Sequence, residues 1–160
     1  MLRLGEMHLF GQAELQKNEK EALRWITHAA ERGNTRAMSR LGNMYLFGQH
    51  GLQKNEKEAL RWIIPAAERG DSLAMFHLGN MFLFGQAGLH KNEKEALRWI
   101  KHAAERRNIQ AMSRLGKMYL LGQHGLQKNK EEALRWLKPA AEKGDASAIA
   151  DLRNMNVSMA

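Results

Sequence analysis

Histidine is the residue of this chain with the most versatile chemistry, because its imidazole binds metals and transfers protons near neutral pH. The chain has seven histidines and no cysteine. A helical metal site needs two ligands on one face, four residues apart. No two histidines have that spacing. We therefore expect no metal site, no thiolate chemistry and no disulfide framework.

The glutamates that recur along the chain are the second candidates for chemistry. They stand three residues after an asparagine, at Glu21, Glu58, Glu95 and Glu132. This spacing is typical of a helix-capping box rather than of an acid and base pair. The sequence shows neither a serine in a strand-to-helix elbow nor a glycine-rich phosphate loop. We expect no catalytic residue, no enzymatic activity and no cofactor.

An internal repeat sets the positions of all these side chains. The tryptophans Trp25, Trp62, Trp99 and Trp136 are each 37 residues from the next. Repeats of this length are typical of solenoids, in which each unit buries its apolar face against its neighbours. The period predicts a single domain over residues 1–160. Its units span approximately 1–33, 34–70, 71–107 and 108–144, followed by a terminal helix at 145–156.

Each period predicts two helices, so the fold class is an all-α solenoid. Asn34 is a good N-cap and Gly48 a good C-terminal stop, which predicts a first helix up to Phe47. A second helix begins at the capping residue Asn55. The expected core positions of the first helix are Ala37, Met38, Leu41, Gly42, Met44 and Tyr45. Those of the second are Ala59, Leu60, Trp62, Ile63, Ala66 and Ala67.

The end of the second helix in the third repeat is an expected weak point. Gly33, Gly70 and Gly144 end the other second helices, but Arg107 stands at this position in the third unit. A left-handed backbone costs an L-residue other than glycine about 1 kcal/mol.

The recurring positions resemble the Sel-1-like repeat, a relative of the tetratricopeptide repeat. They are Ala37, Leu41-Gly42, Tyr45, Gly48, Gly51-Leu52, Asn55, Ala59, Trp62, Ala66-Ala67 and Gly70. The resemblance implies antiparallel helix pairs in a right-handed superhelix whose first helices line a concave groove. It also implies a non-catalytic adaptor or scaffold that binds proteins or peptides. The inter-helix loop is one residue longer than is usual in this family, and asparagine replaces aspartate at the second cap.

Large apolar side chains lie opposite the expected core of the first helices. Leu46 and Phe47 are typical, and two interpretations stay open: groove anchors for a partner, or packing between repeats. We predict that the groove binds its partner through Arg36, Ser39, Asn43, Phe47, Phe76, Asn80, Phe84, Ser113, Lys117 and Leu121. One position of the repeat varies along the chain, and it holds Leu2, Ser39, Phe76 and Ser113. Such variation is what the repeats would need to recognise different residues of a partner.

The net charge of +8 fits an acidic protein or peptide partner. Nucleic-acid binding is an alternative, but glutamates interrupt the basic stripe on the second helices, which disfavours it. An immunity or inhibitor protein that binds a toxin is a narrower version of the same interaction class. A designed or truncated scaffold without a native partner is a further alternative, and so is self-association through the uncapped N-terminal edge.

The sequence contains no apolar run of the length that spans a membrane, and its first residues lack the pattern of a signal peptide. We expect no membrane insertion and a cytoplasmic location for the chain as written. A signal peptide removed beforehand would instead indicate a secreted or periplasmic protein.

Overall fold

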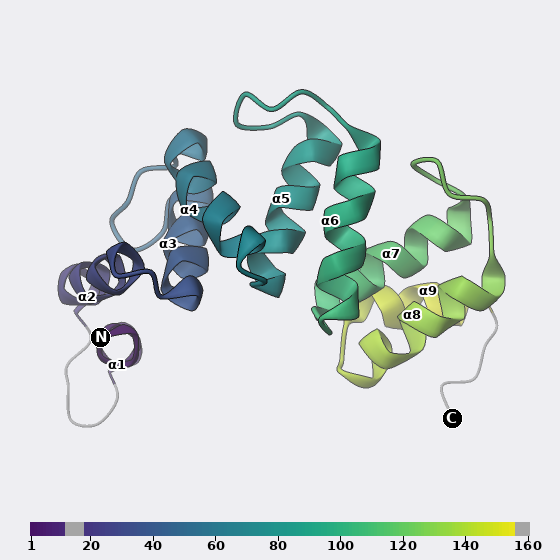
Figure 1. The fold of residues 1–160 in the computed structure, drawn as a ribbon. Coiled ribbons are helices and arrows are strands. Elements are labelled where there is room, and N and C mark those ends of the chain that lie inside the picture. Colours follow the sequence, from purple (N-terminus) through teal and green to yellow (C-terminus); the bar gives the residue numbers. More distant parts are fainter. Residues whose placement is uncertain (12–17, 156–160) are drawn as a thin grey trace. The chain divides into compact units, whose positions relative to one another are not determined.

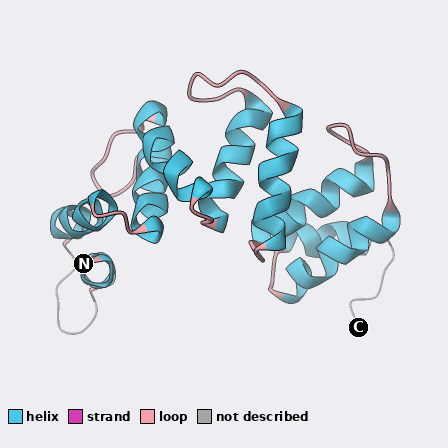
Figure 2. Ribbon diagram, in the orientation of Figure 1, coloured by secondary structure: helices cyan, strands magenta, loops and turns pink. Residues whose placement is uncertain are grey.

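The computed structural model of this chain describes residues 1–11 and 18–155, which form helices joined by loops (Figure 1, Figure 2). The helices are α1 (Leu2–Phe10), α2 (Glu19–Glu31), α3 (Thr35–Phe47), α4 (Glu56–Glu68), α5 (Ser72–Phe84), α6 (Glu93–Glu105), α7 (Ile109–Leu121), α8 (Lys130–Glu142) and α9 (Ala146–Asn154). The described ranges contain no strand, in agreement with the predicted all-α class. None of the helices in these ranges is long and apolar enough to cross a lipid bilayer.

The chain forms two compact units, Met1–Ala74 and Met75–Ala160, which we call unit 1 and unit 2. In unit 1, α1 packs on α2, α2 on α3 and α3 on α4. In unit 2, α6 packs on α7, α7 on α8 and α8 on α9, and α9 also contacts α7. Most contacts therefore join helices that are consecutive in sequence, which is how repeat proteins bury their apolar faces.

The first helices begin at the predicted cap residues. The side chain of Asn34 accepts a hydrogen bond from the amide of Ala37 at 2.9 Å. Asp71, Asn108 and Asp145 accept equivalent bonds at 2.8 to 2.9 Å. Helices α3 and α7 end, also as predicted, at a glycine in the left-handed conformation. Local capping thus fixes both ends of α3 and α7.

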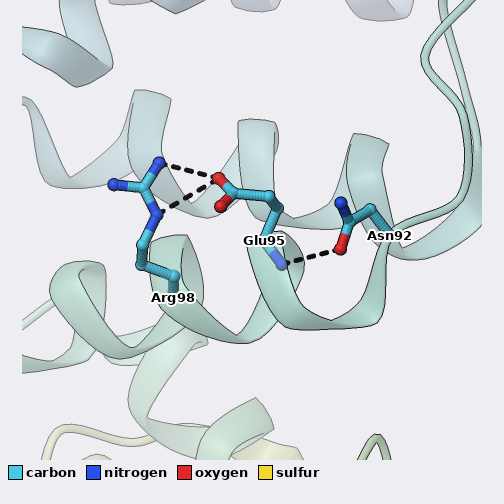
Figure 3. A network of polar contacts seen from close by, with 3 residues as sticks. All are labelled: Asn92, Glu95 and Arg98. Carbon is cyan, nitrogen blue, oxygen red and sulfur yellow. Dashed lines mark hydrogen bonds and ion pairs between the residues drawn. The ribbon is translucent and has the colours of Figure 1, made fainter.

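The second helices form only half of the predicted capping box. The Asn92 side chain accepts a hydrogen bond from the Glu95 amide at 3.1 Å (Figure 3), and the other second helices repeat this bond. In a complete box the Glu95 carboxylate would bind the Asn92 amide. That amide donates instead to the Phe82 carbonyl at 2.8 Å. The carboxylate binds Arg98 at 2.7 Å, so the prediction is wrong for the glutamate side chain.

The amphipathic arcs of both helix types are confirmed in their main features. In α3 the buried residues are Ala37, Met38, Ser39, Leu41, Gly42 and Met44. In α4 they are Ala59, Ile63, Ala66 and Ala67, while Leu60 and Trp62 are half-buried. The core therefore consists largely of alanine and of medium-sized aliphatic side chains.

A glycine in the middle of each first helix lets the backbone of the second helix approach closely. A Cβ atom on Gly116 would lie 2.6 Å from Cγ of Leu137 and 3.2 Å from the carbonyl oxygen of Ala133. Gly42 and Gly79 have the same relation to an isoleucine of their own second helix, at 2.7 Å. These glycines are required by packing, because real Cβ atoms do not approach other atoms so closely.

The terminal helices agree with the sequence in part. Helix α1 has no side-chain cap at Met1, as expected for an uncapped edge. Helix α9 begins after its cap Asp145, and Leu152 keeps the buried stripe with 1% of its surface exposed. The helix ends at Asn154, and position 156 of the predicted terminal helix lies outside the described residues.

The loop between the helices of a pair contains a left-handed residue that the sequence analysis does not predict. His50, Ala87 and His124 have φ values of 53°, 58° and 54°. Each is followed by a glycine with φ of 81° or 82°. The sequence signals only the glycine, because residues other than glycine adopt this conformation at a cost.

Arg107 has the left-handed backbone that the repeat predicts, with φ of 62°. We expect Arg107→Gly to stabilise the protein by about 0.5 to 1 kcal/mol, because glycine removes the strain but makes the unfolded chain more flexible. The melting temperature should rise by about 2 °C. Thermal unfolding followed by circular dichroism measures this change.

Arg106 provides the matched control, because it precedes Arg107 and has φ of −87°. Arg106→Gly removes no strain and should lower the melting temperature. An Arg107→Gly variant that melts below the native protein would contradict the assignment of strain to this residue.

Candidate partner-binding site

The end of each first helix carries an exposed apolar side chain. The exposed fractions are 63% for Phe10, 56% for Phe47, 59% for Phe84 and 51% for Leu121. The preceding residues differ, because Leu9 and Leu83 are buried, with 5% and 3% exposed, whereas Leu46 and Leu120 are half-buried. The two open interpretations therefore apply to different residues. Leu46-type side chains belong to the packing, and Phe47-type side chains lie on the surface.

Three of the predicted groove residues are buried. Ser39, Phe76 and Ser113 expose only 2%, 8% and 5% of their surface. Helix α3 is packed by both α2 and α4, and α7 is packed by α6, α8 and α9, so their buried arcs are wider than the sequence predicts. Variation at this position in the repeat therefore changes packing more directly than it changes the surface.

The predicted polar residues are more accessible, and two of them form ion pairs. Arg36 is exposed and lies 3.6 Å from Glu6, and Lys117 lies 4.0 Å from Asp151. Asn43 and Asn80 are half-buried. The Oδ1 atom of each asparagine is buried without a hydrogen-bond partner in the described part of the chain.

Unit 2 contains a cavity of about 440 Å³ beside α7. Its lining includes three predicted residues, Phe76, Ser113 and Lys117. The other lining residues are Gln110, Arg114, Met118, Gln123, His124, Asp145 and Ser147. The volume lies within the range of about 300 to 1,000 Å³ that is typical of ligand sites. We call these residues, together with Phe84 and Leu121, the α7 site.

Arg114 is the central side chain of the α7 site. Its guanidinium lies over the rings of Phe76 and Phe84, with 5.8 Å and 5.9 Å to the ring centroids. Burial lowers the pKa of Arg114 from its ordinary value, because desolvation disfavours the charged form. Arg114 has no ion pair within residues 1–11 and 18–155. The α7 site therefore holds a half-buried cation that forms no ion pair with a carboxylate of the described residues.

Unit 1 contains the equivalent arginine in a different state. Arg40 lies 74 residues before Arg114, and its guanidinium is 5.8 Å from the ring of Phe10. It is 3.4 Å from the carboxylate of Glu6, which also reaches Arg36. The cavity beside it measures only about 120 Å³. Unit 1 thus provides an arginine with a bound carboxylate, for comparison with unit 2.

The four repeats of this chain match one known protein family. Residues 1–34, 35–71, 72–108 and 109–145 each match the model of the Sel1 repeat. The chain belongs to the Sel1 repeat family. The family has an all-α solenoid fold, and Sel1 repeat proteins are generally non-catalytic protein-interaction modules. The resemblance found in the sequence is therefore confirmed.

Two solved structures are similar to this Sel1 chain. A Sel1 repeat protein from Oxalobacter formigenes is 35% identical with a TM-score of 0.79, and the match covers 94% of this chain and 60% of that protein. The protective antigen c5321 of uropathogenic Escherichia coli strains is 30% identical with a TM-score of 0.83, covering 96% and 32%. The chain thus spans less than two thirds of either protein. Among curated proteins, no sequence matches this chain.

Unit 2 of the Sel1 chain contains a second cavity, which none of the sequence predictions includes. It measures about 580 Å³ and is lined by residues of α6, α7 and α8, including Ile109, Trp136 and Pro139. The repeated tryptophan suggested a core position, yet Trp136 is only half-buried. In the described residues, no group of three histidine, aspartate or glutamate side chains is placed to bind a metal ion.

The loop histidine of the fourth Sel1 repeat bonds to the preceding repeat. His124 Nδ1 lies 3.1 Å from Glu93 Oε1, and the equivalent His50 lies 3.4 Å from Glu19. The hydrogen bond with His124 lowers the pKa of Glu93 below its ordinary value of 4.5, and a bond with Lys91 adds to this effect. This contact joins two consecutive repeats within unit 2.

The lowered pKa of Glu93 predicts an acid-sensitive contribution to stability. Below pH 4.5 the unfolded glutamate binds more protons than the folded one, so acid favours unfolding. The contribution is present above that pH and is lost as the pH falls through the folded pKa. We expect the melting temperature to fall less between pH 6 and pH 3.5 in Glu93→Gln than in the native protein.

His124→Ala is a suitable second variant, because Ala87 already occupies the same left-handed backbone position in another loop. It removes the bond and should reduce the acid sensitivity in the same direction. Equal pH profiles for the native protein and both variants would contradict the role of this contact.

Proposed function

We propose that this chain binds a segment of a partner protein at the α7 site of unit 2. The observation that carries the proposal is that Arg114, which lines a cavity of ligand size, lies over the ring of the exposed Phe84, while the exposed Leu121 is on the same helix as the lining residue Met118. Arg114 lies over the Phe84 ring and lines the cavity, so the apolar and charged parts form one continuous site. Aromatic and arginine side chains are enriched among the residues that dominate binding energy.

The family supports this proposal, because Sel1 repeat proteins are generally interaction modules. An extended or helical segment is the suitable kind of ligand, since the site combines apolar contacts with polar groups of α7 and the following loop. No group at this site suggests a reaction, and the proposed role is binding alone.

Affinity purification from the source cells, followed by titration of the purified partner, tests this function. Replacing Phe84 and Leu121 with serine together should weaken binding by tenfold or more, because truncating an apolar anchor typically costs about 1 to 2 kcal/mol. Both side chains are exposed, so the helical signal and melting temperature should change little.

A matched control carries Lys101→Ser and Lys138→Ser, two exposed residues of the second helices. It should bind the partner with native affinity. If the Phe84 and Leu121 variant also keeps native affinity, the α7 site is not where the partner binds.

A further inference from the structure

We propose that the α7 site recognises an acidic partner segment by taking a glutamate side-chain carboxylate onto Arg114. This inference rests on the proposed function and adds the chemistry of the ligand. Its basis is a comparison of equivalent positions in units 1 and 2, which share most of their sequence. They differ at one position beside the arginine, which is a charged glutamate in unit 1 and a neutral asparagine in unit 2.

The first step is the state of the arginine in unit 1. There the carboxylate of Glu6 lies 3.4 Å from Arg40 and 3.6 Å from Arg36. Glu6 is part of α1, the first helix of the preceding repeat. The chain itself thus supplies a glutamate to this arginine. The bound carboxylate of unit 1 shows which group fits beside an arginine held against a phenylalanine ring.

The second step is the loss of that carboxylate in unit 2. The position equivalent to Glu6, 74 residues later, is Asn80, which has no charge. Its Oδ1 atom is buried without a hydrogen-bond partner among the described residues. Arg114 keeps its place over two aromatic rings but has no carboxylate partner in the part of the chain that the structure describes.

The third step is that the neighbouring carboxylates of unit 2 are already bound elsewhere. Asp145 accepts hydrogen bonds from the Ser113 hydroxyl at 2.7 Å and from the Ala148 amide at 2.8 Å. Asp151 pairs with Lys117, and Glu93 pairs with His124. None of these carboxylates forms an ion pair with Arg114, so Arg114 can take a carboxylate that a partner supplies.

The fourth step is the room beside Arg114. The cavity of unit 2 has about 440 Å³, against about 120 Å³ at the equivalent place in unit 1. Phe76 and Met118 provide apolar lining for the methylene groups of a glutamate, and Gln110 and Ser147 provide neutral polar groups. A half-buried guanidinium binds a carboxylate more strongly than a fully solvated one, because screening by water is weaker.

The test uses N-acetylated, C-amidated hexaglutamate, titrated into the full chain and followed by the NMR signal of the Arg114 side-chain Nε–H group. Arg114→Met, which keeps an apolar stem between the rings, identifies this signal by its loss. Amide signals that line the cavity, such as those of Gln110 and Ser147, report binding in that variant. We expect saturable binding that is at least fivefold weaker in Arg114→Met.

Arg40→Met is the matched control, because Arg40 already has a carboxylate partner. It should change the affinity for hexaglutamate less than twofold. Equal weakening by Arg114→Met and Arg40→Met would mean that only diffuse positive charge attracts the peptide, and this result would overturn the inference.

Asn80→Glu provides a second variant that does not depend on removing a side chain. It places in unit 2 the glutamate that unit 1 has at Glu6. The new carboxylate should occupy Arg114, raise the melting temperature and abolish the response to hexaglutamate. Native peptide affinity in a folded Asn80→Glu protein would contradict the inference.

Three further ligands separate the sources of negative charge. Hexaglutamine should give no shift at Arg114. Acetylated hexaglycine with a free C-terminus should bind at least fivefold more weakly than hexaglutamate. If that peptide or an oligothymidylate shifts the Arg114 signal more strongly than hexaglutamate, the site recognises a chain terminus or a nucleic acid instead, and the glutamate assignment is wrong.

The outcomes distinguish this inference from the proposed function. If Phe84 and Leu121 are required for the partner but Arg114→Met binds it with native affinity, the α7 site is an interaction site without carboxylate recognition. If neither change affects the partner, both proposals are wrong.

Discussion

Replacing Gly116 with valine is expected to destabilise the protein by about 3 kcal/mol. A Cβ atom at this position would lie 2.6 Å and 2.8 Å from the side chain of Leu137, and 3.2 Å from the carbonyl oxygen of Ala133. Leu137 is fully buried, so it cannot move aside into solvent. The two helices α7 and α8 must therefore separate, which weakens the packing along both. Urea unfolding followed by circular dichroism measures the loss.

A double-mutant cycle with Leu137→Ala tests the cause of this loss. Leu137→Ala alone leaves a cavity and should cost about 2 to 5 kcal/mol. In that background, valine at position 116 gains room, so its additional cost should fall below about 1 kcal/mol. Additive effects of the two changes would show that the destabilisation does not arise from the predicted clash.

Replacing Asp145 with alanine is expected to cost about 2 to 4 kcal/mol. Asp145 caps α9 by accepting a hydrogen bond from Ala148, and it accepts another from the buried hydroxyl of Ser113. Losing a cap costs about 1 kcal/mol. Leaving a buried hydroxyl without a partner costs about 1 to 3 kcal/mol more.

Unit 1 supplies the control for Asp145. Asp71 caps its own helix at 2.8 Å, but Ser39 Oγ, the equivalent of Ser113, has no hydrogen-bond partner in the described residues. Asp71→Ala should therefore cost only the cap, about 1 kcal/mol. Equal losses for the two variants, measured by the same urea unfolding, would contradict the proposed contribution of Ser113.

The fold could be predicted from the sequence because its signals are local and repeated. A cap such as Asn34 and a stop such as Gly48 depend only on neighbouring residues, and the period shows them several times. The exposed side chains Phe84 and Leu121 were also predicted from the helical wheel. Periodicity assigns a residue to a face well when that face has a single packing neighbour.

The site was predicted less well, because it depends on contacts between repeats. Ser113 was predicted on the surface, but α9 packs against α7, and this contact gives Ser113 a partner in Asp145. Arg114 is not among the predicted site residues, since an arginine on a polar arc resembles an ordinary solvated residue. The available signal was the change from Glu6 to Asn80, whose meaning depends on knowing that this position faces the arginine of the next repeat.

The backbone bond at the start of each second helix has a consequence for how these repeats can diversify. The amides of Asn55, Asn92 and Asn129 donate to a carbonyl near the end of the preceding helix, at 2.8 to 2.9 Å. Both partners are main-chain groups, so the closure of each hairpin is independent of which side chains its tip carries. The loop positions that are not in the left-handed conformation can therefore accept new side chains, or grafted recognition residues, while the helical framework keeps its register.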